Sequence, residues 1–545
     1  MTSTINYQGN YTAFQSYMLL QIPENFNVIA KDDIFYTVLE IVEGVNIADF
    51  INFKSSRRDS YDKYSLFSAL LLSLAVHGKL ISLRELEKEC RYDIRFQAIL
   101  NGEHPSYKTF QRFINDDISI CVDELLKKVN LYLLDRTYIS RDILYIDGTK
   151  YEAYANKMTF VWKKATDKFY ARNWAKAINH IHAINKYFQE HEIDIKYSIL
   201  KKPDFLYLLK ITDKLEAYAQ SKRIVFVHGK GKRKTELQRI YDNIKECAMK
   251  MFKYEIHYDL FQGRNSFSKT DPDAAFLHMK YDYYNHTNVF KPGYNVQMGV
   301  MDGYIMNLHI NTDGNDMGSF QATVEKYKEM YGMYPKAVCA DAGYGSKKNY
   351  KFCDHNEIKA YIKYASYEKE QSKRTEKNKF KSVQFERDEN HIPICPEGHP
   401  FMIEKLNMYQ DEYQMPEAYA VTRCEHCNTC AMKEKCTKAK NGRSMKIDFT
   451  LEAQKSKVRS NLSTDEGKEA MRNRSIQSEG AFGILKEDYD FDCLSRRGET
   501  GVKIEVYCAS LGFNIKKYHR AKIKEEQEKK KAAKQQWFQN EVIMS

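Results

Sequence analysis

The chain has 545 residues, a formal net charge of +12 at pH 7 and a hydrophobic content of 43%. This length is sufficient for about two to four domains with large buried cores. The longest apolar run, Leu66 to Val76, is too short to span a bilayer, and the first residues lack the basic and apolar segments of a secretion signal. We therefore expect a cytoplasmic protein with reduced cysteines and no membrane partner.

The positive charge favours a polyanionic partner, because lysine and arginine release counterions when they neutralise phosphates. A compositional explanation is equally simple. The chain is rich in Lys, Tyr, Asn and Ile and poor in Gly and Pro, which is typical of an AT-rich coding genome. The charge alone therefore leaves a nucleic-acid partner open.

Helical patterning dominates residues 62–135. An apolar helix is predicted over Leu66–Val76, and Gly78 is expected to end it in the left-handed conformation. Ser82 and Glu85 have the spacing of a capping box, which predicts the start of the next helix.

A third helix is predicted after Pro105, with Lys108, Gln111 and Arg112 exposed. Three short helices with tight turns and basic faces are typical of a helix-turn-helix DNA reader. They are equally typical of a plain helical bundle. We take Lys108 and Arg112 as candidate DNA contacts.

The next part of the chain has a mixed pattern. An apolar strand is predicted to end at Asp147, a charged helical stretch covers about 160–261, and two strands flank an Asp302-Gly303 turn. A helix then leads to a strand that ends at Asp341, and a further helix and strand follow. This order matches a ribonuclease H-like fold, a mixed sheet flanked by helices, with a helical insertion after the first strand.

Three carboxylates stand out in this pattern. Asp147 and Asp341 each follow an apolar strand and precede a glycine-containing turn, so one sheet can bring both to one edge; either alone is ordinary turn chemistry. Glu479 lies in a helical segment with Arg472 and Lys486 seven residues away on either side, on one face at 3.6 residues per turn. Such an acid fits a site for metal and phosphate, with a solvent-exposed salt-bridge ladder as the alternative.

Three blocks of sequence carry a resemblance to a known family. They are YIDGTKYEAYANKMTFVWKK, ADAGYGSKKNY and RSIQSEGAFGILKEDYDFDCLSRRG, which contain Asp147, Asp341 and Glu479 in turn. These blocks resemble the DDE transposases of bacterial insertion sequences. The segment from LAVHGKLISL to PSYKTFQRF is similar to the helical domain that precedes the catalytic core in one branch of them. The resemblance extends over about residues 60–520.

The resemblance implies that Asp147, Asp341 and Glu479 match the acidic triad of the family, which holds two Mg²⁺ or Mn²⁺ ions. Water would hydrolyse the phosphodiester at each element end, and the freed 3′-hydroxyl would attack target DNA in line. The partner implied is double-stranded DNA, both element ends and target. A homodimer is expected because two ends are paired, and the protein would be associated with the nucleoid.

A signature of related enzymes leaves one basic residue undecided. It has a lysine seven residues after the glutamate, which Lys486 satisfies relative to Glu479. It also has an arginine four residues before the glutamate, where this chain has Ser475. Arg474 is one position away and Arg472 is three, so either is a candidate contact to DNA phosphate.

Two other functions stay open at this point. One is a catalytically silent DNA-binding repressor derived from a transposase, which an intact triad disfavours. The other is a metal-dependent nuclease that cuts DNA without joining it, which the triad does not distinguish from a transposase.

Five of the twelve cysteines are clustered late in the chain. The C-x2-C spacing is typical of a four-thiolate zinc site, and the preferred ligands are Cys395, Cys424, Cys427 and either Cys430 or Cys436. An iron–sulfur centre is an alternative, although the run lacks the ferredoxin ending, and so is the absence of a metal. We expect a small structural zinc-ribbon-like insertion.

Other side chains near these elements are weaker candidates. Asp302 and Asp316 lie near strand ends, Asp302 in the hairpin turn, and Asp313 would replace a triad member only if the strand register were shifted. Trp162 and Trp174 are expected to pack in a core, with stacking on bases as the alternative.

The expected fold class is therefore mixed α/β in seven parts. These are an N-terminal helical DNA-binding domain (1–135), the first core strand (136–165), a helical insertion (166–262), the hairpin and second aspartate of the core (263–390), the Cys-rich insertion (391–448), the glutamate helix and a C-terminal helix (449–520), and a basic tail (521–545).

Overall fold

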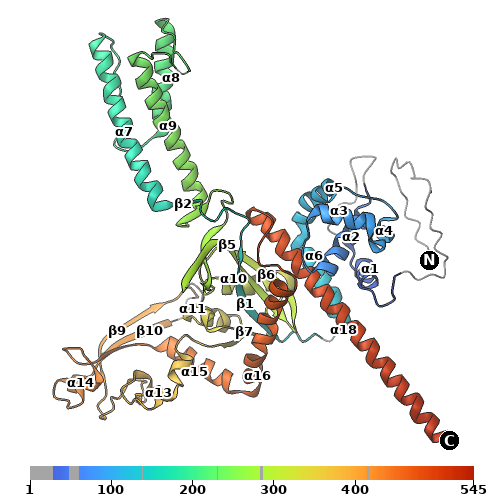
Figure 1. The fold of residues 1–545 in the computed structure, drawn as a ribbon. Coiled ribbons are helices and arrows are strands. Elements are labelled where there is room, and N and C mark those ends of the chain that lie inside the picture. Colours follow the sequence, from blue (N-terminus) through green and yellow to red (C-terminus); the bar gives the residue numbers. More distant parts are fainter. Residues whose placement is uncertain are drawn as a thin grey trace. The chain divides into compact units, whose positions relative to one another are not determined.

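The computed structural model describes residues 29–47, 61–137, 139–229, 231–282, 286–413 and 416–544. Residues 1–28, which the sequence assigns to the N-terminal helical domain, lie outside the described residues. The chain divides into two compact units. Unit 1 comprises 1–151, 295–496 and 500–545, and unit 2 comprises 152–294 and 497–499. Figure 1 labels the elements of both.

The N-terminal part of unit 1 is helical in the described residues. Its helices are α1 (Ile34–Gly44), α2 (Lys63–His77), α3 (Leu83–Tyr92), α4 (Ile94–Leu100), α5 (Tyr107–Arg112) and α6 (Ser119–Arg136), and a π-helical turn at Phe113–Ile118 joins the last two. The helix α4 was not predicted as a separate element, because Asp93 ends α3 and caps α4 at one position.

The predicted helix ends in this region are confirmed. Gly78 follows α2 with φ of 73°, a left-handed conformation that glycine adopts without steric cost. The Glu85 amide donates to the Ser82 Oγ at 3.2 Å, and this hydroxyl donates to a Glu85 carboxylate oxygen at 2.9 Å. The Ser82 half of the capping box therefore forms, and the Glu85 carboxylate binds the Ser82 hydroxyl.

A six-stranded mixed sheet forms the centre of the fold. Its strands are β1 (Ile143–Glu152), β4 (Ala275–Asp282), β5 (Thr287–Met301), β6 (Tyr304–Asn311), β7 (Ala337–Ala340) and β8 (Lys359–Ile362). The order is β4-β5-β1-β7-β8, and β6 also pairs with β5. β1, β7 and β8 run parallel, whereas β4 and β6 are antiparallel to β5.

The predicted hairpin between β5 and β6 is confirmed. Asp302 and Gly303 form its turn with φ of 48° and 75°, and Met301 pairs with Tyr304. Two successive positive φ angles twist in the same sense as the strands, which is why an Asp-Gly pair is favoured here.

Helices cover the sheet within unit 1. They are α10 (Ser319–Tyr331), α11 (Lys347–His355), α15 (Phe449–Ser463), α16 (Asp465–Arg474) and the long α18 (Gly498–Met544). α18 is buried almost all round between Val502 and Ile515. Beyond this part it continues as the charged C-terminal tail, which is helical as far as Met544. None of the described helices combines the length and apolarity needed to cross a membrane.

Two buried asparagines tie the helices to the sheet edge. Asn514 on α18 accepts from the Ile305 amide at 2.9 Å and donates to the Asn130 side chain on α6 at 2.8 Å. Asn130 in turn donates to the Ile305 carbonyl at 3.0 Å. Both side chains are fully satisfied donors and acceptors in a dry environment, so this arrangement favours one docking position over others.

The Cys-rich segment is a small antiparallel sheet in unit 1. Its strands β9 (Met402–Gln410), β10 (Pro416–Arg423) and β11 (Ser444–Asp448) have the order β11-β10-β9. Lys347 on α11 donates to Glu417 at 2.5 Å and to Asp448 at 2.7 Å, which joins this sheet to the core. The segment before it contains the short helices α12 (Tyr367–Glu370) and α13 (Lys373–Glu376).

Besides β4 and the first part of β5, unit 2 contains an antiparallel pair of short strands and three helices. The strands are β2 (Phe160–Trp162) and β3 (Ser266–Ser268), and the helices are α7 (Lys163–Glu190), α8 (Phe205–Ser221) and α9 (Glu236–Phe261). α9 packs on both α7 and α8 (Figure 1). Their core includes Trp174, Ile181, Leu215, Ile244 and Met251.

We expect replacement of Gly512 by alanine to destabilise unit 1. A Cβ at Gly512 of α18 would lie 2.3 Å from the Leu74 carbonyl oxygen of α2, which is backbone and cannot rotate away. Alanine favours a helix by about 1 kcal/mol over glycine, and overpacking costs about 1–3 kcal/mol, so the expected net loss is up to about 2 kcal/mol. Thermal unfolding followed by circular dichroism measures it.

Gly314 provides the matched control, because a Cβ there would meet nothing within 4 Å. Gly314→Ala should unfold at the wild-type temperature. If Gly512→Ala unfolds there as well, α2 and α18 do not pack this closely.

Candidate active site

Asp341 directly follows β7, as predicted. It caps the short 3-10 helix Ala342–Tyr344, and its carboxylate accepts from the Ala342 amide at 2.7 Å. The side chain is exposed. Because backbone amides fix the carboxylate in a cap, it is held at the carboxyl end of the strand.

Asp147 lies inside β1, so the prediction that this strand ends at Asp147 is wrong. β1 continues to Glu152 because it is hydrogen-bonded to the longer strand β5, and this pairing extends past Asp147 and Gly148. The pairing with β7, however, stops at Ile146 and Ala340. Since the two strands are parallel and in this register, Asp147 and Asp341 are the next residues on neighbouring strands.

Glu479 lies in an irregular helical segment rather than in a regular α-helix. After α16 ends at Arg474, a π-helical turn covers Ser475–Glu479, a single α-turn covers Gly480–Gly483, and a second π-helical turn covers Ile484–Asp488. The spacing argument at 3.6 residues per turn, which placed Arg472 and Lys486 on the face of Glu479, is therefore wrong. Each π-turn accommodates an additional residue and shifts the face.

The structure brings Arg474, and not Arg472, to the glutamate. Arg474 Nη2 lies 2.9 Å from Glu479 Oε1, and the arginine side chain is 17% exposed. Hydrogen bonds of a π-turn join residues five apart, so side chains at this spacing become neighbours. The family signature has an arginine four residues before the glutamate, and Arg474 lies five residues before Glu479. The π-turn nevertheless brings Arg474 next to Glu479, while Arg472 is exposed.

The three acids are electrostatically coupled. Burial raises the pKa of Asp147 to about 6, the Gly148 amide and the positive charge of Arg474 lower it, and the negative charges of Asp341 and Glu479 raise it further. Asp341, Glu479 and Arg474 therefore all lie near enough to Asp147 to influence it. One half-buried carboxylate, two exposed carboxylates and one guanidinium form the candidate site.

The site is not arranged as a finished metal-binding centre. Among the residues that the structure describes, no group of three or more His, Cys, Asp or Glu side chains is placed so that it could hold one metal ion. Glu479 is instead engaged with Arg474, with a side chain that is 54% exposed.

The other predicted basic residues lie in different surroundings. Lys486 Nζ donates to Thr149 Oγ1 at 2.6 Å and to the Lys150 carbonyl at 3.1 Å, so it attaches the helical segment to the second half of β1. Lys108 and Arg112 are exposed on α5, as predicted from the sequence.

A buried polar chain beneath the aspartates was missed in the sequence analysis. Tyr344 donates to the Gln297 side-chain oxygen, and the Gln297 amide donates to Asp316 at 2.9 Å. Asn295 donates to the same Asp316 oxygen at 2.7 Å. Because an ionised carboxylate only accepts hydrogen bonds, Asp316 orients both amides, and the Gln297 oxygen must then face Tyr344.

This chain lies against both aspartate-bearing elements. The Gln297 amide nitrogen is 2.3 Å from where a Cβ of Gly148 would be, so only glycine fits after Asp147. Tyr344 ends the turn that Asp341 caps. The available signal was the pair of polar residues, Asn295 and Gln297, within an apolar strand where alternate side chains share one face.

The two tryptophans differ in their surroundings. Trp174 is 7% exposed within the core of unit 2, as expected for a packing residue. Trp162 is 44% exposed, and its ring lies 5.2 Å from that of Phe276 in an edge-to-face arrangement, so the expectation of a buried Trp162 is wrong. Strand β2 lies at the end of its small sheet, which leaves one face of this side chain uncovered.

Four of the five clustered cysteines share a small core. Cys395, Cys424, Cys427 and Cys436 pack with apolar residues of the Cys-rich sheet, whereas Cys430 is outside this group. Burial raises the pKa of the Cys424 thiol to about 12, and the neighbouring Cys427 and Cys395 raise it further. Three sulfur atoms therefore lie close enough to interact.

Several donors are directed at these sulfurs. The His399 amide donates to Cys395 Sγ at 3.4 Å, the Arg443 amide donates to Cys427 Sγ at 3.4 Å, and Arg443 Nη1 donates to Cys436 Sγ at 3.4 Å. Hydrogen bonds to sulfur stabilise a thiolate more than a neutral thiol.

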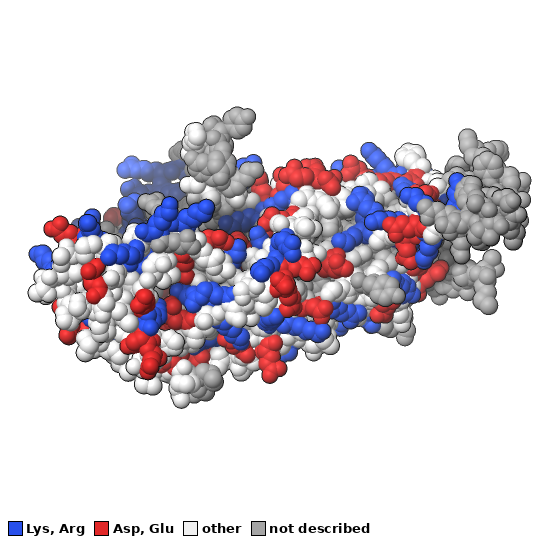
Figure 2. Space-filling model, turned by 90° about the horizontal axis from the view of Figure 1, so that it is seen from below, with Lys and Arg blue, Asp and Glu red and all other residues white. Residues whose placement is uncertain are grey.

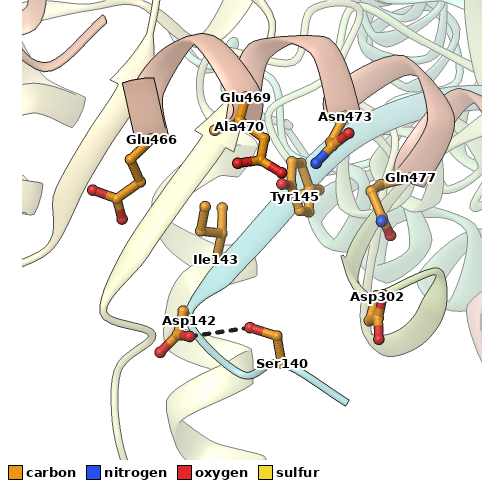
Figure 3. A pocket seen from close by; sticks show the side chains of 10 residues that line it. All are labelled: Ser140, Asp142, Ile143, Tyr145, Asp302, Glu466, Glu469, Ala470, Asn473 and Gln477. Carbon is orange, nitrogen blue, oxygen red and sulfur yellow. Dashed lines mark hydrogen bonds between the residues drawn. The ribbon is translucent and has the colours of Figure 1, made fainter. Parts of the chain in front are cut away.

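A cavity of about 300 Å³ lies between α16, the start of β1 and the turn at Asp302 (Figure 3). Acidic side chains point into or around it, namely Asp142, Asp302, Glu466 and Glu469, together with Tyr145. Lys336 pairs with Asp142 and Lys359 pairs with Glu466, so the remaining negative charge of the cavity comes from Asp302 and Glu469. Such a lining disfavours a phosphate backbone.

Charge on the outer surface is mixed where it can be seen. On the face drawn in Figure 2, Lys and Arg side chains lie among Asp and Glu side chains rather than in one continuous basic surface. A DNA contact must therefore be located from individual elements.

The raised pKa of Asp147 predicts a pH-dependent stability. Its folded value of about 6 exceeds the value of about 3.9 in an unfolded chain, so its ionisation opposes folding. The cost appears as the pH rises from about 4 to about 6 and is complete above this. Without divalent metal, Asp147→Asn should raise the free energy of unfolding by up to about 3 kcal/mol at pH 7.5 and change it little near pH 3.5, measured by denaturant unfolding.

Asp142 serves as a control of opposite sign. A hydrogen bond from Lys336 lowers the pKa of Asp142, so its ionised form favours folding. Asp142→Asn should therefore lower stability at pH 7.5. A loss of stability in Asp147→Asn at this pH would contradict the burial of its charge.

Comparisons with known proteins find two transposase-like regions in the chain. Residues 394–519, which include Glu479, match a family model described as a transposase DDE domain. Residues 24–116 match a second family model described as a transposase domain. No curated protein and no solved structure matches the chain. Two separate regions of one chain thus match transposase models, and on this evidence we assign it to the DDE transposases of insertion elements.

Proposed function

We propose that the chain cuts phosphodiester bonds at the ends of its element and joins the freed ends to target DNA. Transposases of the DDE family act on DNA, and the proposal extends this to the individual residues. The observation that carries it is the coupling of Asp147, Asp341 and Glu479 at one sheet edge.

The donor set fits two Mg²⁺ or Mn²⁺ ions. All three side chains supply carboxylate oxygens, which hard divalent cations prefer. When bound, such ions activate the attacking hydroxyl and stabilise the leaving oxygen. Asp147 and Asp341 are presented by adjacent parallel strands, and Glu479 would join them by leaving its ion pair with Arg474. Arg474 is then free to neutralise a phosphate oxygen.

The fold supports this proposal through its strand order. An antiparallel hairpin of β5 and β6 lies beside β1, and β7 and β8 follow in parallel on the other side. We assign this arrangement to the ribonuclease H-like class, in which acids at the edge of a mixed sheet serve phosphoryl transfer.

Recognition of DNA is assigned to the N-terminal helices. Lys108 and Arg112 are exposed on the outer face of α5, where they can contact phosphates without disturbing the core. A homodimer on DNA is proposed because a transposition reaction requires two element ends in one complex.

We expect Asp147→Asn, Asp341→Asn and Glu479→Gln each to abolish metal-dependent nicking and strand transfer, because each removes one negative charge from the site. A loss of at least about 100-fold is expected from misplaced reacting groups alone. Excision and integration of a plasmid-borne element measure this. Binding to end-bearing DNA in a gel-shift assay should persist in all three variants.

Asp313→Asn is the matched control, since Asp313 lies near the same sheet edge and is exposed. It should remain active. Full activity in any triad variant removes that residue from the site. Nicking without joining by the wild-type chain would favour a nuclease, and binding without nicking would favour a silent repressor.

A structural zinc ion is proposed for the Cys-rich sheet. Cys395, Cys424, Cys427 and Cys436 share one core, and hydrogen-bond donors are already directed at three of their sulfurs. These side chains are not yet placed to hold one ion together in the described residues, so zinc would have to draw the four thiolates into a tetrahedron. Such an ion would stabilise a segment with few other buried residues. The sequence left the fourth ligand open between Cys430 and Cys436, and we propose Cys436.

Elemental analysis of the purified chain should find one zinc per molecule. Cys436→Ser should lose most of it and unfold at a lower temperature, because the remaining thiolates leave the tetrahedron incomplete. Cys430→Ser should keep the metal. Iron in place of zinc, or zinc loss only in Cys430→Ser, would contradict this ligand set.

A further inference from the structure

The outer face of α7 in unit 2 carries a regular row of cations. Lys164, Lys168, Arg172 and Lys176 are spaced four residues apart, and all are exposed. The buried residues of α7, which include Trp174, lie on the opposite side of the helix. At about 100° per residue, this row points almost directly away from the core.

The row lacks the ion pairs found elsewhere in unit 2, although Glu246 of α9 interacts with Lys176 at longer range. Within the described residues, none of its four cations forms an ion pair with a carboxylate, whereas Lys186 pairs with Glu190 on the same helix. On α9, Lys250 pairs with Glu246. The other acid of α7, Asp167, accepts a hydrogen bond from Tyr258 at 2.8 Å and is off the row.

A merely solvated face does not account for this pattern. Like charges four residues apart destabilise a helix, and a solvated surface usually alternates the sign of its charges. α7 instead places three such like-charged pairs in succession. The exposed residues between them include Ala171 and Ala175, whose small side chains allow a partner to approach the helix closely.

We propose that this row binds the phosphate backbone of duplex DNA. Four residues of helix rise about 6 Å, so the row covers about 18 Å, a length over which one strand of the duplex presents about five phosphates. Flexible cations in a line match a polyanion of regular charge spacing better than a single compact anion. The inference rests on the proposed function, since it gives the DNA a second contact outside α5.

The test is the salt dependence of DNA binding by the full-length chain. Fluorescence anisotropy would follow a labelled 40-base-pair duplex of mixed sequence between 50 and 200 mM NaCl, without divalent metal so that no cleavage occurs. Each phosphate contact contributes about 0.9 to the slope of log affinity against log salt. We expect the salt dependence to weaken, with a slope smaller in magnitude by about 3–4, in the variant Lys164→Gln/Lys168→Gln/Arg172→Gln/Lys176→Gln.

A matched variant controls for net charge. Lys201, Lys202, Lys214 and Lys222 are exposed in the same unit, and none has a recorded ion pair in the described residues. Changing these four to glutamine removes the same total charge. The slope should then change by less than about one. Circular dichroism should show wild-type helix content in both variants.

The outcomes separate clearly. An equal change of slope in both variants would show a general charge effect and overturn the proposal, as would an unchanged slope in the α7 variant. Loss of binding to a polyglutamate peptide, with DNA binding intact, would indicate an acidic protein partner and overturn it too. Asp147→Asn should keep the wild-type slope and lose nicking. If it nicks DNA normally, the proposed function fails while the slope still decides the role of α7.

Discussion

The burial of one carboxylate beside two others is the constraint on which the site depends. Asp147 sits inside a strand, where burial raises its pKa to about 6, and Asp341 and Glu479 add further negative charge. Arg474 is the cation that offsets this charge within the protein. The ionised carboxylates of such a site lower the free energy of unfolding, and bound cations would offset this loss. This is typical of functional carboxylates.

The surrounding structure holds this arrangement in place through directional polar contacts. Asp316 fixes the orientation of the Gln297 and Asn295 amides, and Tyr344 completes the chain beneath the two aspartates. A glycine after Asp147 lets Gln297 approach the strand directly. Because these contacts are largely buried and both amide nitrogens donate to two acceptors, they position the sheet edge more firmly than apolar packing alone would.

The same chain shows two ways of using basic residues. Near the site, Arg474 and Lys486 are engaged with protein groups and have defined positions. On α7, Lys164, Lys168, Arg172 and Lys176 are exposed and form no ion pair with a carboxylate among the described residues, which suits a partner of repeating charge. The cations behind the net charge of +12 therefore have two roles. Some bind groups within the protein, and others form a surface that suits a polyanion.

The sequence by itself determined the elements whose signals are local. The capping box at Ser82, the Asp302-Gly303 hairpin and the strand that ends before Asp341 depend on neighbouring residues, and each was correctly predicted. Tertiary structure decided what local periodicity cannot show. The π-turns select Arg474 over Arg472, and pairing with β5 carries β1 past Asp147. Helix register and strand length depend on partners distant in the chain, so only the assembled sheet and helices fix them.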